Sequence, residues 1–399
     1  MKIEIKRNVF AMIFVSIVWF FVWLFAFPLF GPITDGYLSG LRALAIEKGR
    51  FVQFFLVSMG VSSFFFGYLA DRTERRSLLI WVSTIGASLL TLSFVWLNRI
   101  GETFLYSSLL GIAAGVCPPA WGALFAEHIS PEDRGRIMGI SIGFSMPVAQ
   151  LFWLAGPSGI GGAKTKLAVL SSLCLLTLLT ILLRPREEAQ AATPKGRRGP
   201  GAKQLLCYSV SMFLFYWVAG VLLSVVFPTI QDHVSREIFF LICAVPFLIG
   251  AVIGGTFLDA MGRNFPTIVG LAITGVSLAV FGVLGLRLGL ACIFTLAIGY
   301  SLVTILSFVV WADLAPAGSR GVYYGAGSGL MTLAMVVGLF STGTLFGSIS
   351  ASRIQGYMLY SSVALFLCIP PLILADEVLP RELIEKRRFQ QYLEQAKRK

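Results

Sequence analysis

Acidic and basic side chains recur at matched places in the two halves of this chain. They are Asp71, Arg72, Arg75 and Arg76 in the first half, and Asp259 and Arg263 in the second. A carboxylate at a helix end can accept hydrogen bonds from the amino terminus of a neighbouring helix, where the helix dipole favours an anion. This pattern therefore predicts electrostatic contacts between helix ends, which can form and break.

A second pair of charged motifs follows the first pair at a similar distance. Glu127 and Arg134 flank one loop, and Asp313 and Arg320 flank the other. Arg134 and Arg320 lie 186 residues apart, and the two aspartates of the first pair lie 188 apart. Two markers with nearly the same offset indicate a duplicated unit of about half the chain. In a membrane protein, a duplicated multi-span unit is typical of a transporter with its substrate site between the halves.

The elements that must position these residues are membrane-spanning helices. Of the 399 residues, 56% are hydrophobic and only 13% are charged, and the mean hydropathy is +0.82. Twelve charge-free runs of 17 to 32 residues cover 9–34, 51–70, 77–98, 103–126, 137–163, 167–183, 204–231, 238–258, 264–286, 288–312, 321–352 and 354–375. A spanning helix needs about 20 apolar residues and satisfies its own backbone hydrogen bonds in lipid. The sequence predicts an all-α membrane protein of twelve transmembrane helices, arranged as two parallel, pseudo-symmetric six-helix bundles.

The duplication also predicts the domain boundaries. We expect one bundle over 1–184, a cytoplasmic linker rich in Pro, Gly and basic residues over 185–203, a second bundle over 204–375, and a basic tail over 376–399. With the amino terminus in the cytoplasm, 23 of the 32 Lys and Arg fall on the cytoplasmic side. Both termini are therefore expected in the cytoplasm, in a multi-pass protein of the cell membrane. The net charge of +12 indicates topology rather than nucleic-acid binding.

These features resemble the major facilitator superfamily over the whole chain. The loop signature of that superfamily reads roughly Gly-x-Leu-Ala-Asp-Arg-x-Gly-Arg-Arg. The residues that match it are Gly67, Leu69, Ala70, Asp71, Arg72, Arg75 and Arg76. Glu74 replaces the usual Gly, and the second copy has Ala260 where the first has an arginine. The resemblance implies the major facilitator fold but says nothing about the substrate.

The resemblance also implies a gate. In the family, the loop aspartate contacts the start of span eleven when the cytoplasmic side is closed, so we expect Asp71 near Gly321. The adjoining ion-pair network is expected to contain Glu127, Arg134 and the loop arginines, with a mirror copy made by Asp259, Arg263, Asp313 and Arg320. The alternative is that these charges only fix topology and solubility.

A weaker cue lies in the fifth predicted span. Gly143 and the Gly-Pro-rich stretch 156–162 resemble the span-five motif of the drug–proton antiporters. The match is partial, because Phe152 stands where a Gly is usual and the final Gly pair comes one residue late. Small residues also permit close packing in any membrane helix.

The predicted spans contain no Asp, Glu, Lys or Arg, which favours a neutral, lipophilic or amphipathic substrate. The amphipathic and polar side chains that remain as candidate binding residues are Trp19, Trp23, Gln53, Gln150, Trp153, Tyr216, Trp217 and Tyr300. Pockets combine apolar walls with a few such groups. The alternative is that the aromatic residues serve helix packing and membrane interfaces. The two glutamines are better candidates, since an unpaired amide in lipid is costly.

Coupling would have to use residues at the ends of the spans. Spans one and seven both end with Phe-Pro, followed by Asp35 in the first half and by Asp232 and His233 in the second. We expect these groups to meet when the outer side closes, with His233 titrating near physiological pH. The alternative is that they are exposed loop residues.

These observations favour secondary transport by alternating access, with proton-coupled efflux of lipophilic or amphipathic small molecules. The alternatives are a facilitator or symporter for a neutral nutrient such as a sugar, a lipid transporter, or a non-transporting receptor. The chain has no catalytic motif that we recognise, and its two histidines exclude a multi-His metal site. We expect no enzyme activity, cofactor or metal. The expected partners are the substrate, protons and membrane lipid but no nucleic acid, and the protein is expected to be a monomer.

Overall fold

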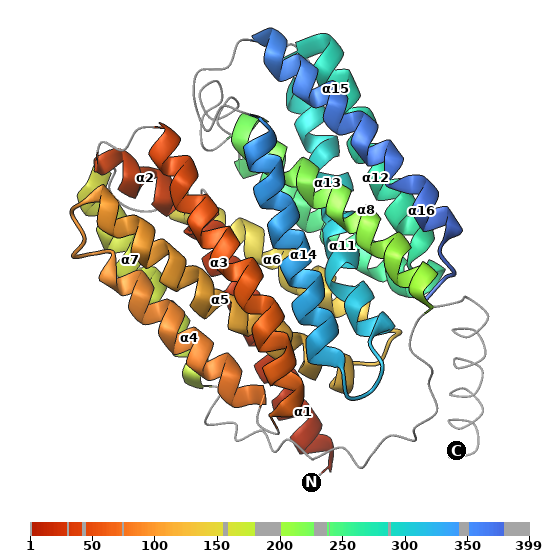
Figure 1. Ribbon diagram of the computed structural model, residues 1–399, viewed down its shortest axis with the longest axis horizontal. Coiled ribbons are helices and arrows are strands. Elements are labelled where there is room, and N and C mark those ends of the chain that lie inside the picture. The colour runs from red at the N-terminus through yellow and green to blue at the C-terminus, as the bar shows by residue number, and fades with distance from the viewer. Residues whose placement is uncertain are drawn as a thin grey trace.

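The computed structural model describes residues 2–29, 32–41, 45–73, 76–154, 159–179, 201–226, 238, 240–285, 289–342 and 351–378. Within these ranges the regular elements are all helical (Figure 1). They are α1 (Lys2–Ala26), α2 (Pro32–Gly40), α3 (Ala45–Arg72), α4 (Arg76–Ser93), α5 (Ile100–His128), α6 (Arg134–Leu154), α7 (Gly159–Leu176), α8 (Ala202–Val221), the π-helical turns η2 (Leu222–Val226) and η3 (Phe240–Ala244), α11 (Val245–Met261), α12 (Asn264–Leu284), α13 (Gly289–Leu314), α14 (Arg320–Ser341), α15 (Ala351–Leu367) and α16 (Ile369–Leu374). The predicted all-α class is confirmed.

Eleven helices of the described part are long and apolar enough to cross a membrane. The helix α6, which corresponds to the fifth predicted span, is not among these eleven and carries several polar residues. It carries Arg134 and Arg136 in its first turn, and Ser141, Ser145 and Gln150 further along. It packs between α1 of its own half and α11 of the other. A helix that is covered by protein on two sides can hold polar residues that lipid would disfavour.

The helices form two groups, which we call the first half (α1–α7) and the second half (α8–α16) (Figure 1). The halves meet chiefly where α3 packs on α14 and where α6 packs on α11. In Figure 1 the two groups lie close together at the lower end and diverge toward the upper end. The lower end carries Asp71, Asp259, Arg134 and Arg320, and we call it the motif end.

The boundary between α6 and α7 differs from the prediction. The run 137–163 was expected to form one span, but α6 ends at Leu154 and α7 begins at Gly159. The two lysines that end the run, Lys164 and Lys166, lie inside α7, because a lysine near a helix end can reach polar surroundings. The Nζ of Lys164 lies 2.9 Å from Oδ1 of Asn98. The second part of the Gly-Pro-rich cue therefore lies in α7, outside the span where the antiporter motif belongs.

The predicted linker and tail lie mostly outside the described residues. Residues 180–200 and 379–399 are not described. The helix α8 begins at Ala202, two residues inside the predicted linker, because Gly201 already serves as its N-cap. The first residues of the predicted tail, 376–378, are described and contact the start of α12 through Glu377.

Candidate functional site

Two carboxylates at the motif end cross from one half to the other. The backbone amides of Gly321 and Val322, at the start of α14, donate to the Oδ atoms of Asp71 at 2.7 and 2.8 Å. In the mirror position, the amides of Gly135 and Arg136, at the start of α6, donate to Asp259 at 2.8 and 2.7 Å. Each carboxylate thus binds the amino terminus of a helix in the opposite half, where amide groups and the helix dipole favour an anion.

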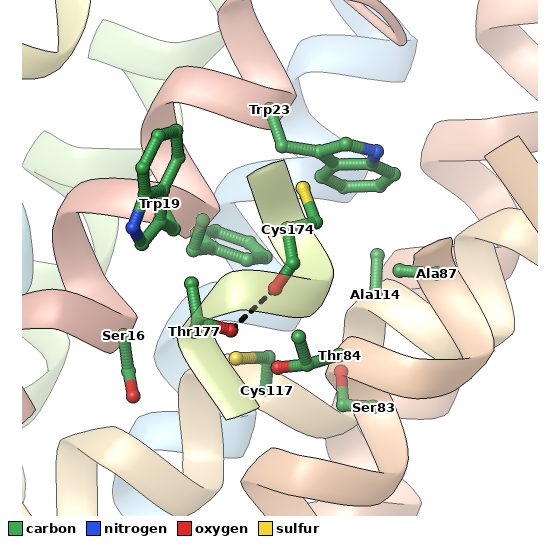
Figure 2. Close-up of a pocket in the computed structure, with 11 residues that line it drawn as sticks. Ser16, Trp19, Trp23, Ser83, Thr84, Ala87, Ala114, Cys117, Cys174 and Thr177 are labelled. Carbon is green, nitrogen blue, oxygen red and sulfur yellow. Dashed lines mark hydrogen bonds between the residues drawn. The ribbon is translucent and has the colours of Figure 1, made fainter. Parts of the chain in front are cut away.

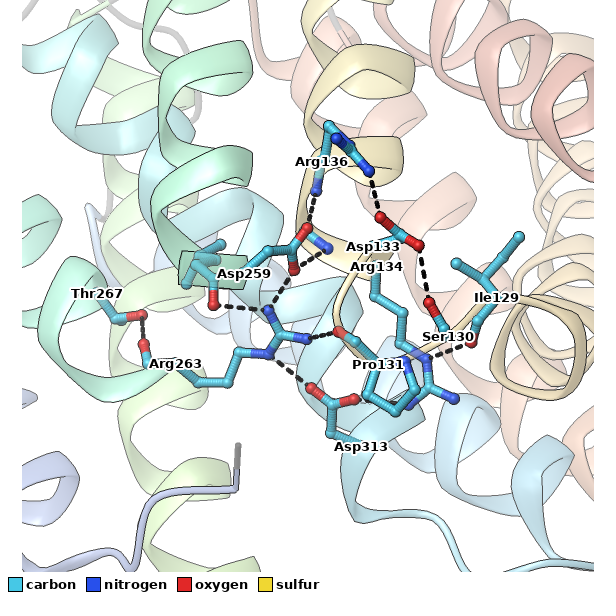
Figure 3. Close-up of polar contacts among 12 residues, drawn as sticks. Ile129, Ser130, Pro131, Asp133, Arg134, Arg136, Asp259, Arg263, Thr267 and Asp313 are labelled. Carbon is cyan, nitrogen blue, oxygen red and sulfur yellow. Dashed lines mark hydrogen bonds and ion pairs between the residues drawn. The ribbon is translucent and has the colours of Figure 1, made fainter. Parts of the chain in front are cut away.

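A third carboxylate, Asp313 at the end of α13, joins two arginines from different halves (Figure 3). Nη1 of Arg134 lies 2.6 Å from its Oδ1, and Nε of Arg263 lies 2.7 Å from its Oδ2. Arg263 also contacts Asp259 at 2.7 Å. The network is therefore continuous from α6, through the end of α13, to the end of α11.

Backbone carbonyls complete the coordination of the two arginines. Arg263 donates to the carbonyl of Pro131 in the first half at 2.6 Å, and Arg134 donates to that of Ala312 in the second half at 3.1 Å. The Arg263 side chain is 0% exposed. Burial alone would lower the pKa of the Arg263 guanidinium, but Asp313 and Asp259 outweigh burial and raise it. Arg263 therefore stays charged, and its charge is matched by the two carboxylates.

The equivalent cluster of the first half is looser. Arg76 hydrogen-bonds Glu127 and lies 3.5 Å from Asp71. Nη1 of Arg320, from the second half, lies 3.7 Å from Glu127. Nε and Nη1 of Arg320 have no hydrogen-bond partner among the described residues. The two clusters are alike in composition but differ in how tightly they join the halves.

Two of the predicted gate arginines lie elsewhere. Arg72 is exposed, and its guanidinium lies over the ring of Tyr68, 4.5 Å from the centroid. The network described above contains no contact with Arg72, so this residue does not join the halves there. Arg75 lies outside the described residues.

Glu377 contributes a contact that the sequence pattern did not indicate. Its carboxylate accepts hydrogen bonds from the backbone amides of Arg263 at 2.7 Å and Asn264 at 2.8 Å, at the start of α12. The only sequence signal for this role is the acidic pair Asp376 and Glu377, which follows the last apolar run. Glu377 therefore fixes the backbone of the arginine whose side chain bridges the halves.

Aromatic side chains close the boundary between the halves above the charged clusters. The ring centroids of Phe21 and Phe308 lie 5.0 Å apart, and those of Trp121 and Phe308 lie 6.1 Å apart. Trp121 also contacts Tyr324, with centroids 5.7 Å apart. In each pair the two residues come from different halves. The motif end is thus closed both by ion pairs and by buried rings.

The structure does not bring the predicted binding residues together in one cavity. Trp19 and Trp23 line a cavity of about 30 Å³ inside the first half (Figure 2). The indole of Trp23 donates to Oγ1 of Thr91 at 2.9 Å. Their neighbours in this cavity include the thiols Cys117 and Cys174. Binding sites for drug-sized ligands measure about 300–1,000 Å³. This cavity is therefore too small for such a substrate in the present state.

The other predicted binding residues lie outside this cavity, on α3, α6, α8 and α13. Gln53 on α3 and Gln150 on α6 are buried, and each has one amide atom without a hydrogen-bond partner. Tyr216 on α8 hydrogen-bonds Ser307 at 2.7 Å. The remaining two that can be placed are Trp217, half-buried on α8, and Tyr300, whose ring lies 4.9 Å from that of Phe215. The Trp153 side chain is not among the described ones.

The predicted coupling residues lie mostly outside the described part. Asp35 belongs to the short helix α2, but its side chain is not described. Asp232 and His233 fall in the stretch 227–237, which is not described either. Their expected meeting therefore stays a prediction.

Comparisons with known proteins agree with this geometry. The chain is 24% identical over 344 residues to "Probable anion transporter 5" of Arabidopsis thaliana, which covers 75% of this chain and 79% of the relative. Its fold is similar to that of the human organic anion transporter MFSD10 (TETRAN), with a TM-score of 0.68 and 16% identity over 92% of this chain and 99% of that one.

A bacterial homologue of the iron transporter ferroportin, in an outward-facing state, has the same TM-score of 0.68 at 17% identity, over 92% of this chain and 98% of the other. At these identities both likenesses concern the fold. Residues 8–339 match the Major Facilitator Superfamily, a family of transporters. That match covers most of both halves, including all four charged motifs. The chain belongs to the Major Facilitator Superfamily.

Proposed function

We propose that this protein is a secondary transporter that moves amphipathic small molecules across the cell membrane by alternating access. The observation that carries the proposal is the crossed pair of contacts made by Asp71 and Asp259 with the first turns of α14 and α6. Both contacts join the halves at the same end, and both are hydrogen bonds that can break without unfolding either half. Such paired contacts suit a gate.

In this proposal the motif-end network is the cytoplasmic gate, and the structure is the state closed to the cytoplasm. The gate consists of Gly67, Asp71, Arg76, Glu127, Arg134, Asp259, Arg263, Asp313 and Arg320. The asymmetry of basic residues supports the cytoplasmic assignment of this end and of both termini. The protein is proposed to act as a monomer in lipid, without a cofactor.

An amphipathic substrate is supported by the chemistry of the boundary between the halves. Buried rings such as Phe21, Trp121 and Phe308 supply apolar surface there, and the charges lie at the helix ends. Coupling to proton exchange is proposed to use Asp35, Asp232 and His233, the ionisable residues at the ends of spans one and seven. Uptake by an Asp35→Asn variant that kept the wild-type pH dependence would contradict this role.

The relatives favour an anion within the amphipathic class. The Arabidopsis relative is named an anion transporter, and the human structure is an organic anion transporter. Among the expectations from sequence, efflux of a neutral lipophilic molecule and uptake of a neutral sugar have no comparable support. An amphipathic anion is therefore the first substrate class to test.

Uptake into proteoliposomes tests the proposal. Three probes share one ring system: naphthalene-2-sulfonate, naphthalene-2-methanol and a naphthylmethyl-trimethylammonium salt. We expect saturable uptake of at least one probe, and loss of most of it in Asp71→Asn. Asp133→Asn is the matched control, since Asp133 is half-exposed at the same end and pairs with Arg136 of its own half. Uptake equal to that of protein-free liposomes for all three probes would contradict the proposal.

A further inference from the structure

Three aromatic side chains have polar atoms without a partner; two of them, Trp121 and Tyr324, meet across the boundary between the halves. Nε1 of Trp121, Nε1 of Trp311 and the hydroxyl of Tyr324 make no hydrogen bond to any described residue. These residues are only 0%, 2% and 1% exposed, respectively. An unsatisfied buried donor costs about 1–3 kcal/mol, so such a group calls for an explanation.

The three groups lie along one face of α14. Arg320, Tyr324 and Gly327 share this face, because residues three and four apart are neighbours on a helix. The indole of Trp311 packs against Gly327, and Trp121 packs against Tyr324. Arg320 begins the same face, and its Nε and Nη1 also lack a hydrogen-bond partner among the described residues. Four side chains with donors that make no hydrogen bond therefore follow one stripe, from the charged cluster into the membrane; Nη1 of Arg320 lies 3.7 Å from Glu127, beyond hydrogen-bond distance.

The unused atoms define the chemistry of a complementary ligand. Indole N–H and guanidinium N–H groups can only donate, and a phenol hydroxyl can donate. A ligand that satisfies them must offer acceptors, as a carboxylate or sulfonate does. The carboxylates nearby are already paired with arginines, Glu127 with Arg76 and Asp313 with Arg134. The unused donors of the stripe therefore favour an anion over a cation.

The stripe lies where the halves would separate. Trp121 belongs to the first half, whereas Trp311, Arg320 and Tyr324 belong to the second. Opening of the motif end would break the contact between Trp121 and Tyr324 and would expose their donors to the pathway, with Trp311 adjoining them through Gly327.

We propose that Trp121, Trp311, Arg320 and Tyr324 form a binding site for an organic anion with a flat apolar body, filled when the motif end is open. The acidic group accepts from the indole, phenol and guanidinium donors, and the apolar body stacks on the freed rings. This inference rests on the proposed function, because the site becomes accessible only if the halves part.

Equilibrium binding of naphthalene-2-sulfonate to the purified full-length protein tests the site. The variants Trp121→Phe, Trp311→Phe and Tyr324→Phe each keep a ring and lose the donor. We expect each to weaken binding by about 3- to 10-fold, the effect of one hydrogen bond, without lowering the melting temperature. Asp71→Asn should tighten apparent binding, because it populates the open state.

Trp81→Phe is the matched control. The indole nitrogen of Trp81 also lacks a partner, but Trp81 lies on α4, which packs on α5 and α7 inside the first half. We expect this variant to bind like the wild type. Equal weakening by Trp81→Phe would overturn the site, and so would wild-type affinity in all three donor variants.

The naphthalene probes separate this inference from the proposed function. If the ammonium probe is transported and the sulfonate neither binds nor is transported, the anion site is wrong while the transporter proposal stands. If no probe enters proteoliposomes yet the sulfonate binds through the three donors, the site stands and transport of this class does not.

Discussion

At the residue scale, the equivalent carboxylates Asp313 and Glu127 differ in burial and in the number of arginines that bind them. Asp313 is 3% exposed and is hydrogen-bonded by two buried arginines. Glu127 is 13% exposed, with one hydrogen-bonded arginine and a second at 3.7 Å. Removing one partner of a buried ion pair is costly, because a charge is then left unpaired in the interior. The second-half cluster should therefore contribute more to stability than its mirror image.

Neutralising each carboxylate tests that difference. We expect Asp313→Asn to destabilise the protein by about 3–5 kcal/mol, as found for broken buried pairs. The matched variant Glu127→Gln should cost about 1.5 kcal/mol, the lower end for a hydrogen bond to a charged group. Thermal unfolding in one detergent compares the two. Equal losses, or a larger loss in Glu127→Gln, would refute the asymmetry.

The hydrogen bonds between Asp71 and the start of α14 can be tested by the variant Asp71→Asn. Asparagine keeps an acceptor oxygen at this position but loses the charge that the helix dipole favours. That change is worth about 1–2 kcal/mol in a partly buried site, or about 5- to 30-fold in an equilibrium. Hydrogen exchange of the Gly321 and Val322 amides should accelerate accordingly in Asp71→Asn. Unchanged exchange at both amides, with Asp133→Asn as the reference, would argue against the contact.

Part of this site can be predicted from sequence and part cannot. The repeat of the charged motifs predicts the two halves, and the approach of Asp71 to Gly321 is predictable from the resemblance of the loop motif to the superfamily signature. The carbonyls of Pro131 and Ala312, which bind the buried arginines, carry no side-chain signal. The unused donors of Trp121 and Tyr324 are also invisible in sequence, because the lack of a partner depends on every neighbour in space.

At the element scale, close approach of small residues sets the distance between the halves. A methyl group at Gly67 would lie 2.7 Å from the carbonyl oxygen of Gly321 and 2.9 Å from Cα of Gly325. Gly135 and Gly255 meet in the same way between α6 and α11. Small residues at such contacts let helix backbones approach closely in membranes. The helix ends carrying the carboxylates can therefore reach the amides opposite them.

A single methyl group should disturb this packing. We expect Gly67→Ala to cost about 1–3 kcal/mol through overpacking and to speed hydrogen exchange at the start of α14. Gly101→Ala is the control, because a methyl group there meets nothing within 4 Å. The control should be neutral or slightly stabilising, since alanine favours helix over glycine. If the stability and hydrogen exchange of Gly67→Ala matched those of Gly101→Ala, the contact between α3 and α14 would not be tightly packed.

The elements show why the ends of spans are harder to predict than their centres. Charge-free runs identify the apolar centre of a span, as in α12 and α13. Charges near a helix end do not stop the helix, so Glu47, Lys48 and Arg50 lie within α3 and Lys164 lies within α7. Because Lys164 does not stop α7, this helix begins earlier in the chain, at Gly159, and includes the last glycines of the Gly-Pro-rich stretch 156–162.

At the scale of the whole molecule, every cross-half contact of the charged clusters lies at one end. The chain begins at that end with α1, and α14 also starts there (Figure 1). Two helix–helix contacts that are related by the repeat, α3 with α14 and α6 with α11, hold the halves together. Alternating access requires a rocking motion of one half against the other. Such a motion would break both helix–helix contacts at the motif end together.

Distances across both ends of the molecule test the central claim most directly. Pulsed electron spin resonance in lipid nanodiscs would use a variant without the six native cysteines. One pair of spin labels, at the exposed residues His128 and Ala317, spans the motif end, and another, at Arg99 and Arg353, spans the opposite end. Alternating access predicts that Asp71→Asn lengthens the first distance and shortens the second. An unchanged first distance, or a lengthening of both, would contradict the account.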